Sequence, residues 1–196
     1  DPNHPLSNHP DARVAAQPKT HKERQRAFAL ARDWVTPSPR QGEINDSTII
    51  QSSWADIVSS ANRHNKPGEF TTFIGYEYTT TGEIDQANLH RNVIFAGDKA
   101  PLSPFSRLDS ENPEDLWRWM DQLRDQGIDS IAIPHNSNGS NGQMFSLTDF
   151  SGKDFTQEYS DIRMRNEPLV EISQIKGTSE THPELSPADQ WADFEI

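Results

Sequence analysis

Three side chains that can bind a metal ion lie at the boundaries of segments rich in β-branched, aromatic and apolar residues. Glu77 lies near the end of FTTFIGYEY, after Gly75, a glycine that would let backbone or metal approach closely. His90 precedes the apolar triplet Val93 to Phe95, and His135 directly follows SIAIP. One carboxylate and two imidazoles match the mixed oxygen and nitrogen shell of hydrolytic metal centres.

Taken one at a time, these residues have simpler interpretations. A strand-end glutamate is more often a surface or salt-bridge residue, a histidine that leaves a buried strand can cap the core, and His90 can be a polar strand entry. No short fixed spacing such as HExxH links the three. Their arrival from separate strands nevertheless favours a site for a divalent metal ion, with Zn, Mn or Fe as the candidates.

Charged residues near these positions could bind an anionic substrate. Arg91 adjoins His90, and its guanidinium could grip a phosphate or carboxylate in a bidentate manner, or form an ordinary salt bridge. The segment KGTSETHP after the last apolar stretch brings Lys176, Glu180 and His182 together with several hydroxyl groups. Such a loop could bind substrate or close over a site, and it could equally be a solvated turn.

Composition excludes several other classes. The chain has no cysteine, which removes disulfides, thiolate metal sites and cysteine nucleophiles. A formal net charge of -12 opposes binding to a nucleic-acid backbone. No apolar run approaches the roughly 20 residues that a membrane span requires. Neither a nucleophilic-serine elbow nor a phosphate-cradling glycine motif occurs.

The surrounding pattern predicts alternating helices and strands. Thr20 to Val35 and the segment that Asp46 or Ser47 caps have helical periodicity, and Pro67 and Gly68 end the second. Asn112 followed by Pro113 predicts a helix start, and Gly127 its end. The remaining expected elements are strands at 70–78, 93–95, 130–134 and 169–175, and a helix at 155–164.

This order predicts the α/β class. We expect one partial domain over 1–196, with an extended arm at 1–19, a helical region at 20–66 and a strand and helix core at 67–196. Strands that alternate with helices favour parallel packing. About four strands are too few for a closed eight-stranded barrel. The expected fold is therefore a partial, distorted (β/α) barrel with long loops.

Several longer strings resemble a known family over nearly the whole chain. They are PGEFTTFIGYEYT, NLHRNVIF, DSENPEDLWRWMD, IPHNSNGSNGQMF, RMRNEPLVEISQIKGTSETHP and LSPADQWADFE. Together they closely resemble the bacterial domain-of-unknown-function family 3604. That family is similar to the polymerase-and-histidinol-phosphatase (PHP) superfamily, whose members fold as distorted barrels and bind up to three metal ions for phosphoester hydrolysis.

The resemblance implies that Glu77, His90 and His135 stand at superfamily ligand positions. The superfamily also uses an early His-x-His pair, a further early His and a late Asp-x-His, none of which this sequence contains. Together with Asp1 in place of an initiator Met, this leads us to expect an internal fragment, inactive by itself, whose site the remainder of its own chain completes. The resemblance also implies an exported or periplasmic protein.

The first functional hypothesis is a metal-dependent hydrolase of the phosphoesterase type that acts on a small anionic molecule. Arg91, Asn136 and Lys176 would bind the substrate, and Glu180 and His182 would transfer protons. A second hypothesis is a non-catalytic binding or structural module with the same fold. A third is a metallohydrolase that cleaves a sulfate ester or an amide.

Overall fold

The computed structural model describes residues 13, 17–35, 46–82 and 87–194, without the side chains of residues 31–35. Within the 196 residues, two compact units are distinguished, Asp1–Ser53 and Trp54–Ile196, and each is described by itself. Most of the predicted arm at 1–19 lies outside the described residues. The expectation of a single domain stays a prediction.

In the first unit, helix α2 (His21–Val35) begins with a reciprocal cap. The Thr20 hydroxyl accepts a hydrogen bond from the Glu23 amide at 3.2 Å, and the Glu23 carboxylate accepts one from the Thr20 amide at 3.0 Å. Such a capping box satisfies amides that have no partner within the helix. Hydrogen bonds from the Lys19 amide and the Thr20 amide lower the pKa of the Glu23 carboxyl. The predicted helix is thus confirmed.

Helix α3 (Ser47–His64) also begins where predicted, because the Asp46 carboxylate accepts a hydrogen bond from the Thr48 amide at 2.8 Å. It ends before a turn in which Gly68 adopts a φ of 85°, a conformation that favours glycine. In the second unit, the Trp54 indole packs edge-on against the Tyr76 ring and donates to the Pro101 carbonyl.

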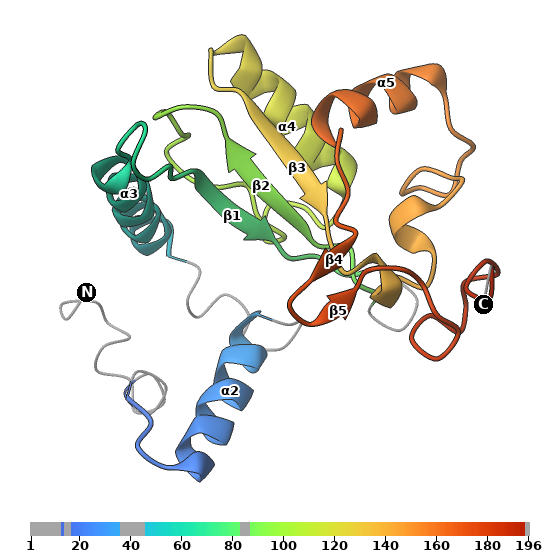
Figure 1. Cartoon of the computed structure of the whole chain (residues 1–196), viewed down its shortest axis with the longest axis horizontal. Coiled ribbons are helices and arrows are strands. Elements are labelled where there is room, and N and C mark those ends of the chain that lie inside the picture. Colours follow the sequence, from blue (N-terminus) through green and yellow to red (C-terminus); the bar gives the residue numbers. More distant parts are fainter. Residues whose placement is uncertain (1–12, 14–16, 36–45, 83–86, 195–196) are drawn as a thin grey trace. The chain divides into compact units, whose positions relative to one another are not determined.

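The second unit is built on a three-stranded antiparallel sheet in the order β1 (Ile74–Tyr78), β2 (Arg91–Phe95) and β3 (Ser130–Pro134). In its register, Tyr78 is paired with Arg91 and Arg91 with Pro134, so these three residues lie side by side across the sheet. Helix α4 (Pro113–Asp125) lies along one face of this sheet (Figure 1). The side chains that pack between them are Ile74, Tyr78, Val93, Phe95, Leu116, Met120, Leu123 and Ala132.

Helix α4 confirms the sequence pattern at both ends. The Asn112 side chain accepts a hydrogen bond from the Glu114 amide at 2.9 Å, and Gly127 follows the helix with a φ of 79°. Helix α5 (Gln157–Asn166) starts slightly later than expected, where the Thr156 hydroxyl caps the Tyr159 amide. Two single-turn 3-10 helices, Ser137–Gly139 and Gln143–Phe145, lie between β3 and α5.

Two fold predictions are wrong. The sheet is antiparallel rather than parallel, because β2 runs opposite to both of its neighbours. The expected strand at 169–175 is reduced to β4 (Ser173–Gln174), which pairs with β5 (Gly177–Thr178) in a short hairpin. Within the described residues the strands form no closed barrel. The prediction and the structure therefore agree on the mixed α/β class.

Candidate metal centre

The antiparallel register explains how three distant residues converge. Glu77 is the penultimate residue of β1, His90 immediately precedes β2, and His135 immediately follows β3. In an antiparallel sheet the start of the central strand lies beside the ends of its two neighbours. The His135 amide donates to the His90 carbonyl across this edge.

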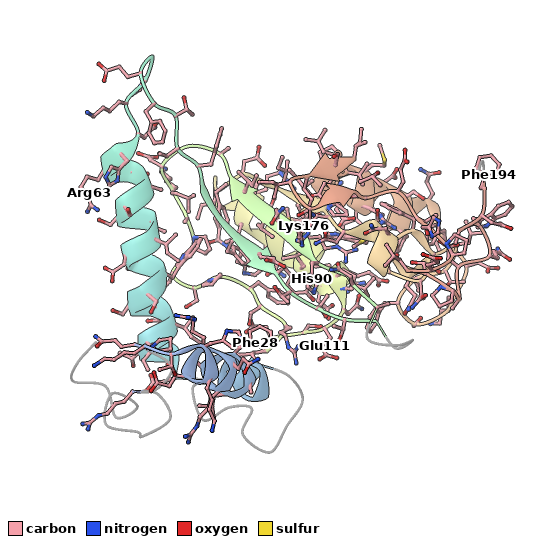
Figure 2. The ribbon with its side chains drawn as sticks, turned by 60° about the horizontal axis from the view of Figure 1, so that its bottom comes forward. Phe28, Arg63, His90, Glu111, Lys176 and Phe194 are labelled. Carbon is pink, nitrogen blue, oxygen red and sulfur yellow. The ribbon has the colours of Figure 1, made fainter. Side chains whose placement is uncertain are left out.

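Side-chain alternation then places all three on one face. Tyr78, Arg91 and Pro134 face the core, so the residues one step away, Glu77, His90 and His135, face the opposite side. We call these three residues the strand-end cluster. Figure 2 labels His90 at this end of the sheet.

The cluster is compact. His90 Nδ1 lies 2.8 Å from Glu77 Oε1, and His135 Nε2 lies 3.4 Å from the same oxygen. The two imidazole rings meet nearly edge to face, with centroids 5.7 Å apart. One candidate ligand atom from each residue lies within 4.8 Å of the other two. The side chains are 45%, 21% and 9% exposed in the order Glu77, His90 and His135, so the cluster opens toward solvent at the carboxylate.

The electrostatics favour a neutral His90. Burial lowers the pKa of its imidazole, while the adjacent Glu77 carboxylate acts in the opposite direction and His135 adds to the lowering. Neutral imidazole is the form that ligates metal ions.

A second observation bears on whether a metal would fit. His135 Nε2 is buried and makes no hydrogen bond, although it faces the Glu77 carboxylate. A buried polar atom without a partner is uncommon and often marks a site for an unseen ion or water. Two imidazoles and one carboxylate form a set that Zn, Mn and Fe accept. The strand-end cluster therefore has the chemistry to hold a divalent metal ion.

Asn136 lies directly beside the cluster, in a left-handed conformation with a φ of 53°. Its side-chain nitrogen is 2.7 Å from His135 Nδ1, and its side-chain oxygen accepts from Gln174 Nε2 at 2.5 Å. Asn136, which was predicted to bind substrate, is thus hydrogen-bonded to the ring of His135, a candidate metal ligand. Its substrate role stays a prediction.

Arg91 lies on the opposite face of the sheet from its neighbour His90. It faces the core, and its Nε donates to Glu167 Oε1 at 2.7 Å, with both side chains only 2% exposed. The same carboxylate oxygen accepts from Trp117 Nε1 at 2.8 Å. Arg91 also lines a cavity of about 300 Å³ together with Arg163. A substrate role at that cavity stays untested, and the guanidinium points away from the strand-end cluster.

The three charged residues of segment 176–183, the late segment, lie at exposed positions. Lys176 occupies the exposed turn between β4 and β5, and Glu180 and His182 are also exposed. His182 Nδ1 accepts from the Glu184 amide at 3.2 Å, as in an ordinary turn. Among the described residues, neither Glu180 nor His182 belongs to the group whose ligand atoms converge. Their catalytic roles stay predictions.

Sequence reasoning missed Glu171 and Glu167. Glu171 accepts hydrogen bonds from three groups next to the cluster, and Glu167 neutralises Arg91. Glu171 falls in the apolar stretch LVEIS, where a lone acid inside a strand-like pattern was a usable signal. Nothing comparable distinguishes Glu167 before the fold is known.

Fold and site together define an α/β protein with a candidate metal centre at the edge of a sheet. A family model described as protein of unknown function (DUF3604) matches residues 5–196, so the chain belongs to this family. No curated protein and no solved structure matches the chain. Among the described residues, no helix combines the length and apolar character needed to span a membrane.

Proposed function

We propose that Glu77, His90 and His135 hold a divalent metal ion, Zn, Mn or Fe, in a metal-dependent hydrolase of the phosphoesterase type. The proposal rests on the convergence of their ligand atoms within 4.8 Å of one another. One of these residues, the buried His135, has no hydrogen-bond partner at Nε2. An ion held by these three residues would supply an activated water for attack on an ester, since divalent metals lower the pKa of water that they bind.

The positions of the three ligands indicate what the protein's own residues would do in this reaction. The sheet backbone fixes His90 and His135 at adjacent strand boundaries, which limits the motion of both rings. Glu77 is the most exposed of the three and leaves the cluster open to a small anionic substrate. Asn136 and Lys176 remain the proposed substrate ligands at the cluster, and Glu180 and His182 the proposed proton-transfer groups. Arg91 faces the other side of the sheet and would bind only the part of a substrate that entered the cavity it lines.

A larger ligand shell is part of the same proposal. By its similarity to the PHP superfamily, the chain would form part of a distorted barrel, and the remainder of its own chain would supply further ligands. The three ligands named here would then be necessary for binding, and the full activity would belong to the longer protein.

The competing proposal is a binding or structural module that keeps the fold without catalysis. The exposed positions of Glu180 and His182 favour it over an assembled active site. A hydrolase of sulfate esters or amides is the third candidate, since the same ligands serve each of these reactions.

Metal analysis separates the first two proposals. The chain and a form extended at both ends are purified and analysed by plasma mass spectrometry, and Zn, Mn and Fe binding is measured by calorimetry. H135N should abolish binding, whereas H64Q, at an exposed histidine bonded to the Ser60 carbonyl, should not change it. Absence of metal from both forms would leave the binding module as the better proposal. A panel of phosphate esters, sulfate esters and amides, offered to a metal-loaded extended form, then separates the hydrolase candidates.

A further inference from the structure

A row of hydrogen-bonded side chains leads away from His135. Asn136 Nδ2 lies 2.7 Å from His135 Nδ1, and Asn136 Oδ1 lies 2.5 Å from Gln174 Nε2. The same Gln174 nitrogen lies 2.8 Å from Glu171 Oε1. The row therefore runs from Glu171 through two amides to one ring nitrogen of the buried histidine.

Glu171 is anchored at the far end of this row. Its Oε1 also accepts from the Ser179 hydroxyl at 2.5 Å and from the Asn136 amide at 3.2 Å, and its own amide donates to the Pro134 carbonyl. Burial acts to raise the pKa of the Glu171 carboxyl, but the hydrogen bonds from Ser179, Asn136 and Gln174 outweigh it, and the pKa is lowered. The carboxylate is accordingly ionised near neutral pH and can only accept hydrogen bonds.

An acceptor at one end fixes the direction of every bond in the row. Because Glu171 accepts, Gln174 must present its amide nitrogen, which also faces Asn136. Asn136 must then present its oxygen to Gln174 and its nitrogen to His135 Nδ1. A neutral imidazole that accepts at Nδ1 carries its proton on Nε2.

The proton on Nε2 points toward the strand-end cluster. His135 Nε2 lies 3.4 Å from Glu77 Oε1, so this N–H faces a carboxylate. His135 offers a free Nε2 lone pair only after the proton leaves that atom. A move of the proton to Nδ1 requires Asn136 to turn its oxygen toward the ring, and Gln174 to turn with it.

We propose that Glu171, acting through Gln174 and Asn136, is a positioning residue that sets the tautomer of His135 and thereby opposes metal uptake at Nε2. The claim about the tautomer of His135 is argued from the hydrogen bonds, and the claim about metal uptake rests on the proposed function. The row also joins the cluster to the β4–β5 hairpin, since Gln174 belongs to β4 and Ser179 follows β5. A change in that hairpin would reach His135 through two amide groups.

The first test is ¹⁵N NMR of the metal-free chain labelled at histidine, at pH 8, where imidazole is ordinarily neutral. Protonated and unprotonated ring nitrogens have well-separated ¹⁵N shifts, and H135N identifies the His135 signals by their loss. We expect Nε2–H in the unmodified chain and comparable populations of both tautomers in Q174M, which removes the amide but nearly keeps the volume. E184Q, at an exposed carboxylate on a nearby turn, should keep the Nε2–H form.

The second test is Zn²⁺ titration of the same proteins by calorimetry. Q174M frees Asn136 to turn without changing any charge, so it should bind Zn²⁺ roughly 2- to 10-fold more tightly, the size of one neutral hydrogen bond. E171A is a stronger perturbation and is compared only if its far-ultraviolet circular dichroism matches that of the unmodified chain.

The outcomes separate the two proposals. An Nδ1–H tautomer in the unmodified chain, or an unchanged Nε2–H form in Q174M, overturns the positioning role. The expected tautomers without Zn²⁺ binding by any variant, either in this chain or in the form extended at both ends, would leave the row in place and refute the metal site. Zn²⁺ binding of equal strength by Q174M and the unmodified chain would refute the opposition to metal uptake.

Discussion

The strand-end cluster and the late segment 176–183 hold similar chemical groups but differ in what positions them. Glu77, His90 and His135 come from three places far apart in the sequence, yet their ligand atoms converge within 4.8 Å. Lys176, Glu180 and His182 are close in the sequence, yet all three are exposed on a two-residue-strand hairpin and the turns after it.

The difference shows what makes a cluster. Each residue of the strand-end cluster is fixed by a sheet whose opposite face packs on α4. The late segment has few buried neighbours to hold its charged side chains in place. Proximity in sequence therefore says less about a site than the register of the strands that deliver its residues.

The largest expected effect comes from breaking the core beneath the cluster. Trp117 is fully buried, donates to Glu167 and meets the Tyr159 ring edge-on. W117A should lower the free energy of unfolding by about 3–5 kcal/mol in urea denaturation. W191A removes a tryptophan that is 62% exposed in the chain after the late segment, and should change the free energy of unfolding by less than about 0.5 kcal/mol. Equal losses would show that the chain around Trp191 is packed as firmly as the sheet.

The buried ion pair offers the next largest effect. R91M removes the closer of two cations that pair with Glu167, since Arg163 Nε still lies 3.2 Å from Glu167 Oε2, and should cost about 1.5–3 kcal/mol through the lost charged hydrogen bond. The double variant R91M/E167Q should be less stable still, because it also leaves the partly buried Arg163 without its carboxylate. K176M, at an exposed position, should be near neutral. A double variant no less stable than R91M would show that the Arg163–Glu167 pair adds nothing to folding.

Metal affinity contrasts the two histidine-bearing regions directly. H90Q removes one of three ligands and should weaken Zn²⁺ binding by at least the roughly 10- to 100-fold that loss of an outer-shell partner costs. H182Q should leave the affinity unchanged, since His182 lies outside the converging group. Calorimetry on both variants measures the contrast. If H182Q weakened binding as much as H90Q, the late segment would have to be counted among the ligands.

The smallest effect concerns the surface network that joins α4 to α5. Hydrogen bonds from Arg165 lower the pKa of the Asp121 carboxyl, Asn166 and the charge of Arg124 add to this, and partial burial opposes them. A lowered folded-state pKa gives stability that is present above the unfolded value of about 3.9 and is lost as the pH falls through the folded value.

The unmodified chain should therefore lose roughly 1 kcal/mol more than D121N between pH 5 and pH 2. Urea denaturation across that range measures the difference, and high salt should reduce it by screening. Parallel curves at low salt would show that the network adds nothing to folding.

Local chemistry made the helices predictable. Asn112 and Gly127 bound α4 as expected, and the Thr20 and Asp46 caps mark the starts of α2 and α3. These signals act within one helical turn, so they need no information about the rest of the chain. The strand at 130–134 was predictable for a similar reason, as a short apolar run between turn residues.

Strand direction was not predictable in the same way. The pattern of alternating helices and strands favoured parallel packing, but the partners of β2 are antiparallel. Apolar periodicity shows which face of a strand is buried and contains no information on the direction of its neighbour. The strand predicted at 169–175 was wrong for a similar reason. Ile172 and Ile175 have the β-branched side chains typical of strands, yet both are largely exposed.

The sequence by itself determined the α/β class, the starts of α2, α3 and α4 and the residue types of a candidate metal site, because propensity, capping and ligand chemistry are local properties. Only the tertiary structure decided that His90 and Arg91 face opposite sides of the sheet, that Glu167 neutralises Arg91, and that Glu171 is connected to His135. These contacts join residues far apart in the chain, and strand register and loop return, which no local pattern encodes, bring them together.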